Sequence, residues 1–151
     1  MMNAAALEMI APPLGFAELK ENFALLDEWD DRYAYLIDLG RKLPSLPEVY
    51  KTEGTKVRGC MSQVWLVPGG TTADFRFAAD SDSSIVKGLI AVLASLFSGH
   101  SAAEVAAIDA EAEFRALGLE QHLSPNRRNG FVAMVGRIKD EARAMAARGG
   151  A

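Results

Sequence analysis

The chain has 151 residues, of which 50% are hydrophobic and 24% are charged, and its formal net charge at pH 7 is −4. This length fits one domain with a real hydrophobic core. The sequence has no basic stripe, which argues against a nucleic-acid-binding protein, and no apolar run long enough to span a bilayer. The single cysteine, Cys60, cannot form an internal disulfide, so we expect a reducing, cytoplasmic location.

The ends of the chain read differently from its middle. Residues 1–13 lack the cationic region of a secretion signal and end in two prolines, so we expect a flexible leader. Residues 14–147 are expected to form a single domain, because they contain no linker or repeat. Residues 148–151 are expected to fray.

Two amphipathic helices are predicted at the start of the domain. The first has an apolar stripe with spacings of three and four, formed by Phe16, Leu19, Phe23 and Leu26. The second carries a similar stripe, formed by Trp29, Tyr33, Leu36, Ile37 and Gly40. Pro44 ends this second helix, since the residue before a proline avoids the helical region.

The middle of the chain predicts a small sheet. Residues 55–58 alternate in polarity, residues 63–67 are rich in β-branched and aromatic side chains, and residues 72–79 alternate again. Pro68-Gly69-Gly70 predicts a turn between the last two strands. We therefore expect a three-stranded meander, antiparallel at least between the second and third strands.

The second half predicts helices again. Residues 85–97 are apolar around most of a helix, which is typical of a central, buried element. We expect the stretch Asp80-Ser81-Asp82-Ser83 to cap it, with Asp80 and Asp82 acting as caps rather than as ligands. Shorter helices are predicted near residues 101–108 and 111–117, and a last helix follows Pro125. The fold class is therefore α+β, with a small antiparallel three-stranded sheet packed against several helices.

The stretch from Lys56 to Trp65 carries the chemistry. Cys60 follows Gly59 and lies between two strand-like runs, as a thiol at the tip of a loop would. A nearby cation lowers the pKa of a thiol, so Arg58 is expected to favour the thiolate. A single thiolate can attack a carbon, a peroxide or a sulfur.

Each of these reactions asks for something different. Attack on carbon needs a base, and the two histidines, His100 and His122, lie in contexts that do not demand catalysis. Attack on a peroxide usually needs a resolving cysteine, which is absent. Attack on a persulfide needs neither, because the partner brings the second sulfur. A lone cysteine is, however, more often a small buried hydrophobe.

Four blocks of the sequence, in order, resemble the SufE family of sulfur acceptors. Residues 59–65 read GCMSQVW, which looks like the family's cysteine signature GCxSQVW. The other blocks resemble its first helices, the start of its central helix and the approach to its last helix. They comprise residues 23–33 with 39–44, 80–82 with 85–89, and 119–127 with Gly130.

The resemblance implies a fold similar to the IscU scaffold and a sulfur-transfer role. Cys60 would accept persulfide sulfur from a SufS-type cysteine desulfurase, stimulate that enzyme and pass sulfur to iron–sulfur scaffold proteins. The pyridoxal phosphate would belong to the desulfurase, and this chain would bind no cofactor or metal. Met61 stands where the family often has glutamine, and a paralogous branch serves another desulfurase, so the donor stays open.

The resemblance also implies which residues surround the thiol. Arg127 matches a family arginine that could stabilise a thiolate or persulfide, although it could equally be a solvated helix charge. The candidates for facing the partner are Arg58, Gly59, Met61, Ser62 and Gln63.

Two other functions remain open at this point. The chain could be a regulatory module that activates a desulfurase by docking alone, or a cysteine hydrolase with His122 as its base. A cluster scaffold is a poor fit, because one cysteine and two distant histidines make a poor iron site. The protein is expected to be a monomer or a weak homodimer.

Overall fold

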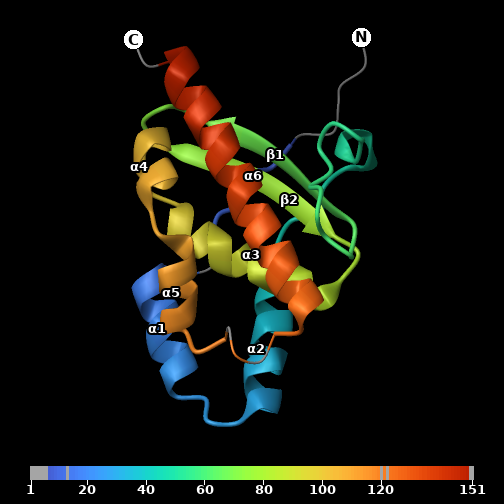
Figure 1. Ribbon diagram of the computed structural model, residues 1–151, viewed down its shortest axis with the longest axis vertical. Coiled ribbons are helices and arrows are strands. Elements are labelled where there is room, and N and C mark those ends of the chain that lie inside the picture. Colours follow the sequence, from blue (N-terminus) through green and yellow to red (C-terminus); the bar gives the residue numbers. More distant parts are fainter. Residues whose placement is uncertain (1–6, 13, 120, 122, 150–151) are drawn as a thin grey trace.

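The computed structural model describes residues 7–12, 14–119, 121 and 123–149, and it has the expected α+β architecture (Figure 1). The elements, in chain order, are α1 (Phe16–Ala24), α2 (Trp29–Arg41), the 3-10 turn η1 (Glu48–Tyr50), β1 (Val64–Gly70), β2 (Phe75–Ser81), α3 (Ser84–Phe97), α4 (Ala102–Ala107), α5 (Ala110–Ala116) and α6 (Pro125–Gly149). The predicted helices are confirmed, because their apolar periodicity is a local property of the chain.

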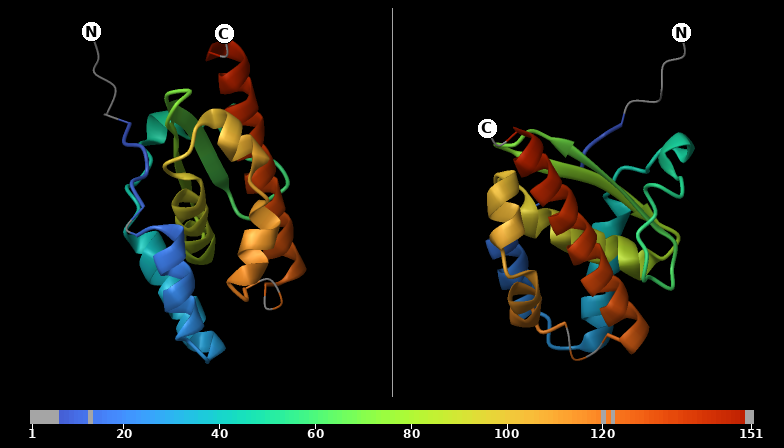
Figure 2. Two further views of the ribbon diagram at one scale, coloured as in Figure 1. Left: turned by 90° about the vertical axis from the view of Figure 1, so that its left-hand side faces the viewer. Right: turned by 45° about the horizontal axis from the view of Figure 1, so that its top comes forward.

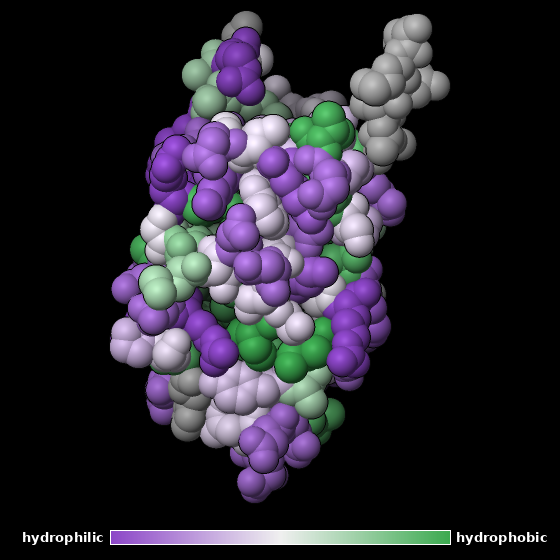
Figure 3. Space-filling model, turned by 90° about the vertical axis from the view of Figure 1, so that its right-hand side faces the viewer, coloured by the Kyte–Doolittle hydropathy of each residue, from purple (hydrophilic) through white to green (hydrophobic). Residues whose placement is uncertain are grey.

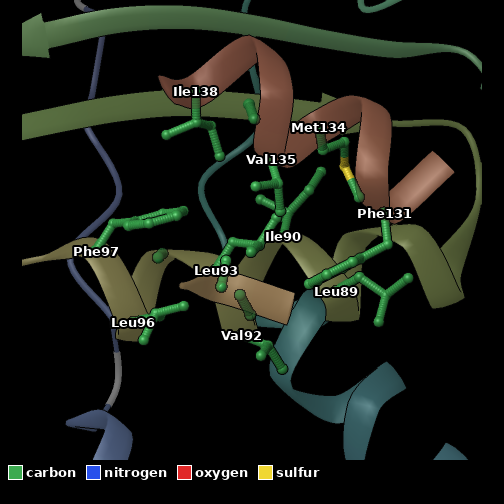
Figure 4. Packing of buried hydrophobic residues seen from close by; sticks show 14 of the residues in the cluster. Leu89, Ile90, Val92, Leu93, Leu96, Phe97, Phe131, Met134, Val135 and Ile138 are labelled. Atoms are coloured by element: carbon green, nitrogen blue, oxygen red, sulfur yellow. The ribbon is translucent and has the colours of Figure 1, made fainter. Parts of the chain in front are cut away.

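Helix α3 is the central element, as its sequence predicts. It is buried along nearly its whole length, from Val86 to Phe97. In the left view of Figure 2 it lies between the α1–α2 pair and α6. Figure 4 shows its residues Leu89, Ile90 and Leu93 packed toward residues of α6. Burying apolar surface on several sides of one helix supplies most of the driving force for this fold.

The sheet has two strands rather than the expected three. β1 and β2 pair antiparallel from Val64↔Ser81 to Gly70↔Phe75. The expected first strand, residues 55–58, makes only an isolated bridge, Lys56↔Trp65. On the edge of this segment that faces away from β1, Arg137 of α6 donates a hydrogen bond to the Lys56 carbonyl at 3.0 Å.

The predicted turn at residues 68–70 is wrong as well. These residues continue β1, and the reversal comes later, where the Thr71 N–H donates to the Asp74 carbonyl at 3.0 Å. Pro68 lies opposite Phe77 in the pairing. With only two strands, each strand is an edge of the sheet, and an edge strand tolerates a proline that lacks an N–H donor.

Asp80 and Asp82 do not cap α3. The cap is Ser83, whose hydroxyl accepts a hydrogen bond from the Val86 N–H. Asp80 is buried at the end of β2 and accepts from the Leu46 N–H at 3.0 Å, with Lys51 and Lys87 as its ion-pair partners. A buried carboxylate with two cations and an N–H donor is a structural brace.

Described residues near both ends of the chain take part in the fold. In the expected leader, Ile10 is 2% exposed and donates its N–H to the Phe77 carbonyl at 2.9 Å. α6 continues through residue 149, two residues into the expected frayed tail. Among the described helices, none combines the length and hydropathy needed to cross a membrane.

The contact between α2 and α3 is close because glycines face backbone. A Cβ added to Gly88 would collide with the Leu36 carbonyl, and one added to Gly40 would lie 2.7 Å from the Gly88 nitrogen. Neither obstacle is a flexible side chain, so the helices would have to separate.

We therefore expect Gly88→Ala to lower the free energy of unfolding by about 1–3 kcal/mol, as overpacking does. The matched control is Gly136→Ala on α6, where a Cβ meets nothing within 4 Å. There, alanine should raise stability by about 1 kcal/mol through helix propensity. Chemical denaturation of both variants measures the difference, and a Gly88→Ala variant as stable as Gly136→Ala would contradict the close packing.

Candidate functional site

Cys60 lies in a short tip of the chain just before β1. Gly59 has a φ of +91°, which favours glycine, and it turns the chain immediately before the thiol. A Cβ on Gly59 would lie 3.3 Å from the Ala133 side chain, so the loop runs close against α6. The predicted turn at the glycine before the cysteine is confirmed, but the thiol faces α6.

The thiol is turned toward α6 and is only partly exposed. Its Sγ lies 3.7 Å from the Gly130 carbonyl oxygen, which it can reach as a hydrogen-bond donor. A thiol is a weak donor, so this contact holds the loop lightly. It ties a residue near the middle of the sequence to the first turns of the last helix.

A cavity of about 310 Å³ opens beside Cys60. Its apolar lining comes from α3 and α6, and its polar lining comes from the loop and the segment at the start of α6. The lining residues are Cys60, Met61, Ser62, Val86, Leu89, Ser124, Asn126, Arg127, Gly130, Phe131 and Met134. Figure 4 shows Leu89, Phe131 and Met134 where α3 meets α6.

The surface near the loop has a mixed character. Figure 3 views the molecule from the side on which the cysteine loop lies in Figure 1, and hydrophobic residues gather there within a hydrophilic border. Met61, next to the thiol, is 78% exposed despite its apolar side chain. A hydrophobic patch with a polar rim can mark a surface that contacts a partner, whereas a single exposed apolar side chain needs no such explanation.

The electrostatics differ from the expectation drawn from the sequence. Burial raises the pKa of the Cys60 thiol above its ordinary value, because removing water disfavours the charged form. Arg58, expected to lower that pKa, instead lies on the surface with its guanidinium 3.5 Å from the Glu53 carboxylate. The expectation that Arg58 favours the thiolate is therefore not met, and burial in this conformation disfavours the thiolate.

The structure brings some predicted site residues together and separates others. Arg127 lines the cavity with Met61 and Ser62, although its residue as a whole is exposed. Gln63 is held by its backbone, which donates to Asp82 at 3.1 Å. His100 lies just before α4, with Nδ1 3.8 Å from Glu104.

The hydrolase hypothesis depends on His122, which lies outside the described residues. His100, the other histidine of the chain, does not line the cavity that contains Cys60. The hydrolase hypothesis therefore gains no support from the described part of the site.

Arg137 is a residue that the sequence did not single out. Its guanidinium donates hydrogen bonds from α6 to two backbone carbonyls that precede the cysteine in the chain. These are the carbonyls of Gly54, at 2.7 Å, and of Lys56, at 3.0 Å. Glu141, one turn along the helix, accepts from its Nε at 3.0 Å. The only signal in the sequence is the spacing of Arg137 and Glu141, which is common on solvated helices and says nothing of the loop.

Comparison with known proteins agrees with the resemblance of the sequence blocks. A family model described as "SufE: Fe-S metabolism associated domain" matches residues 17–142. An uncharacterized SufE-like protein of Rhizobium meliloti is 48% identical over 129 residues, which cover 83% of this chain and 92% of that protein. An uncharacterized SufE-like protein of Rhizobium etli is 45% identical over 135 residues, covering 86% and 90%.

The fold also has a solved counterpart. The solution structure of a hypothetical protein from Thermus thermophilus matches with a TM-score of 0.72 and 21% sequence identity, covering 91% of this chain and 99% of that one. At this low sequence identity, the similarity supports a shared fold and nothing more. With the family match across the domain, the chain belongs to the SufE family, which is associated with iron–sulfur metabolism.

The raised pKa predicts how Cys60 reacts with an alkylating reagent. The rate of modification by iodoacetamide should rise with pH through a midpoint above about 8.5, the value of a free cysteine, because burial penalises the thiolate. In denaturant the midpoint should fall to the ordinary value. Rates measured by mass spectrometry across the pH range test this, and a native midpoint at or below the denatured one would contradict it.

Proposed function

We propose that the protein is a sulfur acceptor and carrier, and that Cys60 takes persulfide sulfur from a SufS-type cysteine desulfurase. The observation that carries this proposal is the position of the only cysteine of a SufE-family chain. It lies after a glycine turn, beside a cavity of about 310 Å³, and next to the exposed Met61. A thiol in that position can be reached by a partner when the tip moves.

The reaction needs only the two sulfur centres. The Cys60 thiolate attacks the outer sulfur of the donor's persulfide, a new S–S bond forms on Cys60, and the donor's S–S bond breaks. The donor thiolate leaves and takes up the proton that Cys60 gave up. No net oxidation occurs, because one persulfide and one thiol become one thiol and one persulfide.

The raised pKa fits a carrier that is active only when it is docked. At rest, burial keeps Cys60 protonated and therefore weakly nucleophilic. Movement of the tip away from α6 would break the 3.7 Å contact with the Gly130 carbonyl and restore hydration of the thiol. The thiolate would then form in the presence of the donor, where its attack is productive.

The remaining roles follow from the same proposal. The desulfurase holds the pyridoxal phosphate and is stimulated because its persulfide is removed, whereas this chain holds no cofactor and carries sulfur only transiently on Cys60. Iron–sulfur scaffold proteins are the proposed recipients, and the cytoplasm is the proposed location. Arg58, Gly59, Met61, Ser62 and Gln63 are proposed to face the partner.

The first experiment measures intact mass after the protein is mixed with a cysteine desulfurase, pyridoxal phosphate and cysteine without reductant. We expect a gain of about one sulfur atom, which reductant removes, as for any persulfide. Cys60→Ser should keep the fold, gain no sulfur and fail to stimulate the desulfurase. Full stimulation by Cys60→Ser would instead support a regulatory module that acts by docking alone.

Arg127 is proposed to stabilise the thiolate or persulfide from the wall of the cavity. Arg127→Gln should slow sulfur uptake about tenfold, the effect of losing about 1.4 kcal/mol of charge-assisted hydrogen bonding. Single-turnover uptake followed by mass spectrometry measures this rate. Arg143→Gln is the control, because Arg143 lies farther along α6 and pairs only with Asp140 in the ion pairs described. Equal rates for the two variants would make Arg127 a solvated helix charge.

A further inference from the structure

We propose that Arg137 is a positioning residue that clamps the upstream limb of the cysteine loop to α6, so that only residues 58–62 move when Cys60 meets its donor. The proposal rests on the proposed sulfur-acceptor function, because a thiol that must reach a partner needs a tip that moves and ends that do not. Arg137 does not touch the thiol, and it acts through the backbone that carries it.

The clamp is built from two backbone carbonyls and one guanidinium. Arg137 donates to Gly54 at 2.7 Å and to Lys56 at 3.0 Å through its two terminal nitrogens. The planar fork of arginine suits two acceptors at once, which a lysine ammonium does not reproduce. Its Nε is held by Glu141 at 3.0 Å, and both side chains are 24% exposed. The guanidinium is therefore fixed in direction before it meets the loop.

Hydrogen bonds hold the upstream limb on both of its edges. On the inner edge, the Val57 N–H donates to the Val64 carbonyl at 2.8 Å, and the Leu66 N–H donates to the Thr55 carbonyl at 2.8 Å. On the outer edge, Arg137 takes the Lys56 carbonyl that a further strand would otherwise use. The upstream limb is thus held from β1 on one side and from α6 on the other.

The downstream limb has its own anchor at the end of β2. The Gln63 N–H donates to the Asp82 carboxylate at 3.1 Å, and the Asp82 N–H donates to the Gln63 carbonyl at 3.3 Å. Between the two anchors, residues 58–62 form a local turn at Arg58 and Gly59, and no backbone hydrogen bond described for this part of the chain joins them to β1 or α6. The tip is joined to α6 by the weak contact between Cys60 Sγ and Gly130.

The two kinds of contact divide the loop into a fixed part and a movable part. Charge-assisted hydrogen bonds to two carbonyls are much stronger than one thiol–carbonyl contact. The tip can therefore leave the cavity at low cost, while its ends keep their places. A fixed start point limits where the thiol can go, and this limit pre-organises it for a partner.

The test replaces Arg137 with methionine, which keeps an unbranched apolar stem and removes the donors. In the free protein at fixed pH, Cys60 of Arg137→Met should be alkylated about five- to tenfold faster, because local opening becomes easier. In the desulfurase assay, more of this variant should be needed for half-maximal stimulation, while the maximal rate changes little. Arg137→Lys should fall between the variant and the natural chain in both measurements.

Arg143→Met is the matched control. It removes an arginine from the same helix, but Arg143 pairs with Asp140 at 3.2 Å and is not among the residues that bond the loop. Both readouts should stay at the natural values. Hydrogen exchange of the natural chain provides a measurement that needs no variant: the Val57 and Leu66 amides should exchange slowly, and those of residues 59–62 should exchange rapidly.

Several outcomes would overturn the clamp. The clamp is excluded if a folded Arg137→Met variant is alkylated at Cys60, and stimulates the desulfurase at half-saturation, just as the natural chain does. It is also excluded if Arg143→Met changes both measurements as much as Arg137→Met. If Arg137→Met does not fold, equal exchange rates at Val57 and at the tip would also exclude it. Alkylation and exchange need no desulfurase, so they test the clamp alone. Failure of the natural chain to gain sulfur would overturn the proposed function without touching these results.

Discussion

The burial of α3 is the constraint on which the rest of the structure depends. α3 is apolar on most sides, so it must be covered by α2 on one side and by the sheet and α6 on others. When α6 takes its place there, its first turns bring Gly130, Phe131 and Arg127 beside the cysteine loop. The cavity is a consequence of this packing, since its apolar wall is the place where the two helices meet.

The same packing sets the chemistry of Cys60. The thiol held beside that wall is only partly exposed, and this burial raises its pKa and disfavours the thiolate. In this conformation, burial of the Cys60 thiol therefore opposes its ionisation to the nucleophilic thiolate. In the function proposed above, a tip that moves between two fixed anchors would remove this conflict, because Cys60 would regain hydration where it meets its sulfur donor.

Prediction from the sequence succeeded where structure is local. The helices follow from apolar spacing, and the turn at Gly59 follows from the needs of the backbone. It failed at residues 55–58, whose alternation is typical of a strand, because the chain turns at residues 53–55 and leaves only the single bridge between Lys56 and Trp65. It failed again at Arg58, where nearness in sequence suggested an electrostatic effect on the thiol that the side chain, turned to Glu53, does not exert.

By itself, the sequence determined the helices, the α+β class, the identity of the one nucleophile and the family to which the chain belongs, because each of these is written in a continuous stretch of residues. Only the tertiary structure decided the burial that raises the pKa of Cys60, the cavity beside it and the contacts of Arg137 with the loop. These depend on groups separated by about half the chain, which approach one another because the burial of α3 brings α6 against the loop. Burial and long-range hydrogen bonds arise only when these distant segments come together, so a continuous stretch of sequence does not reveal them.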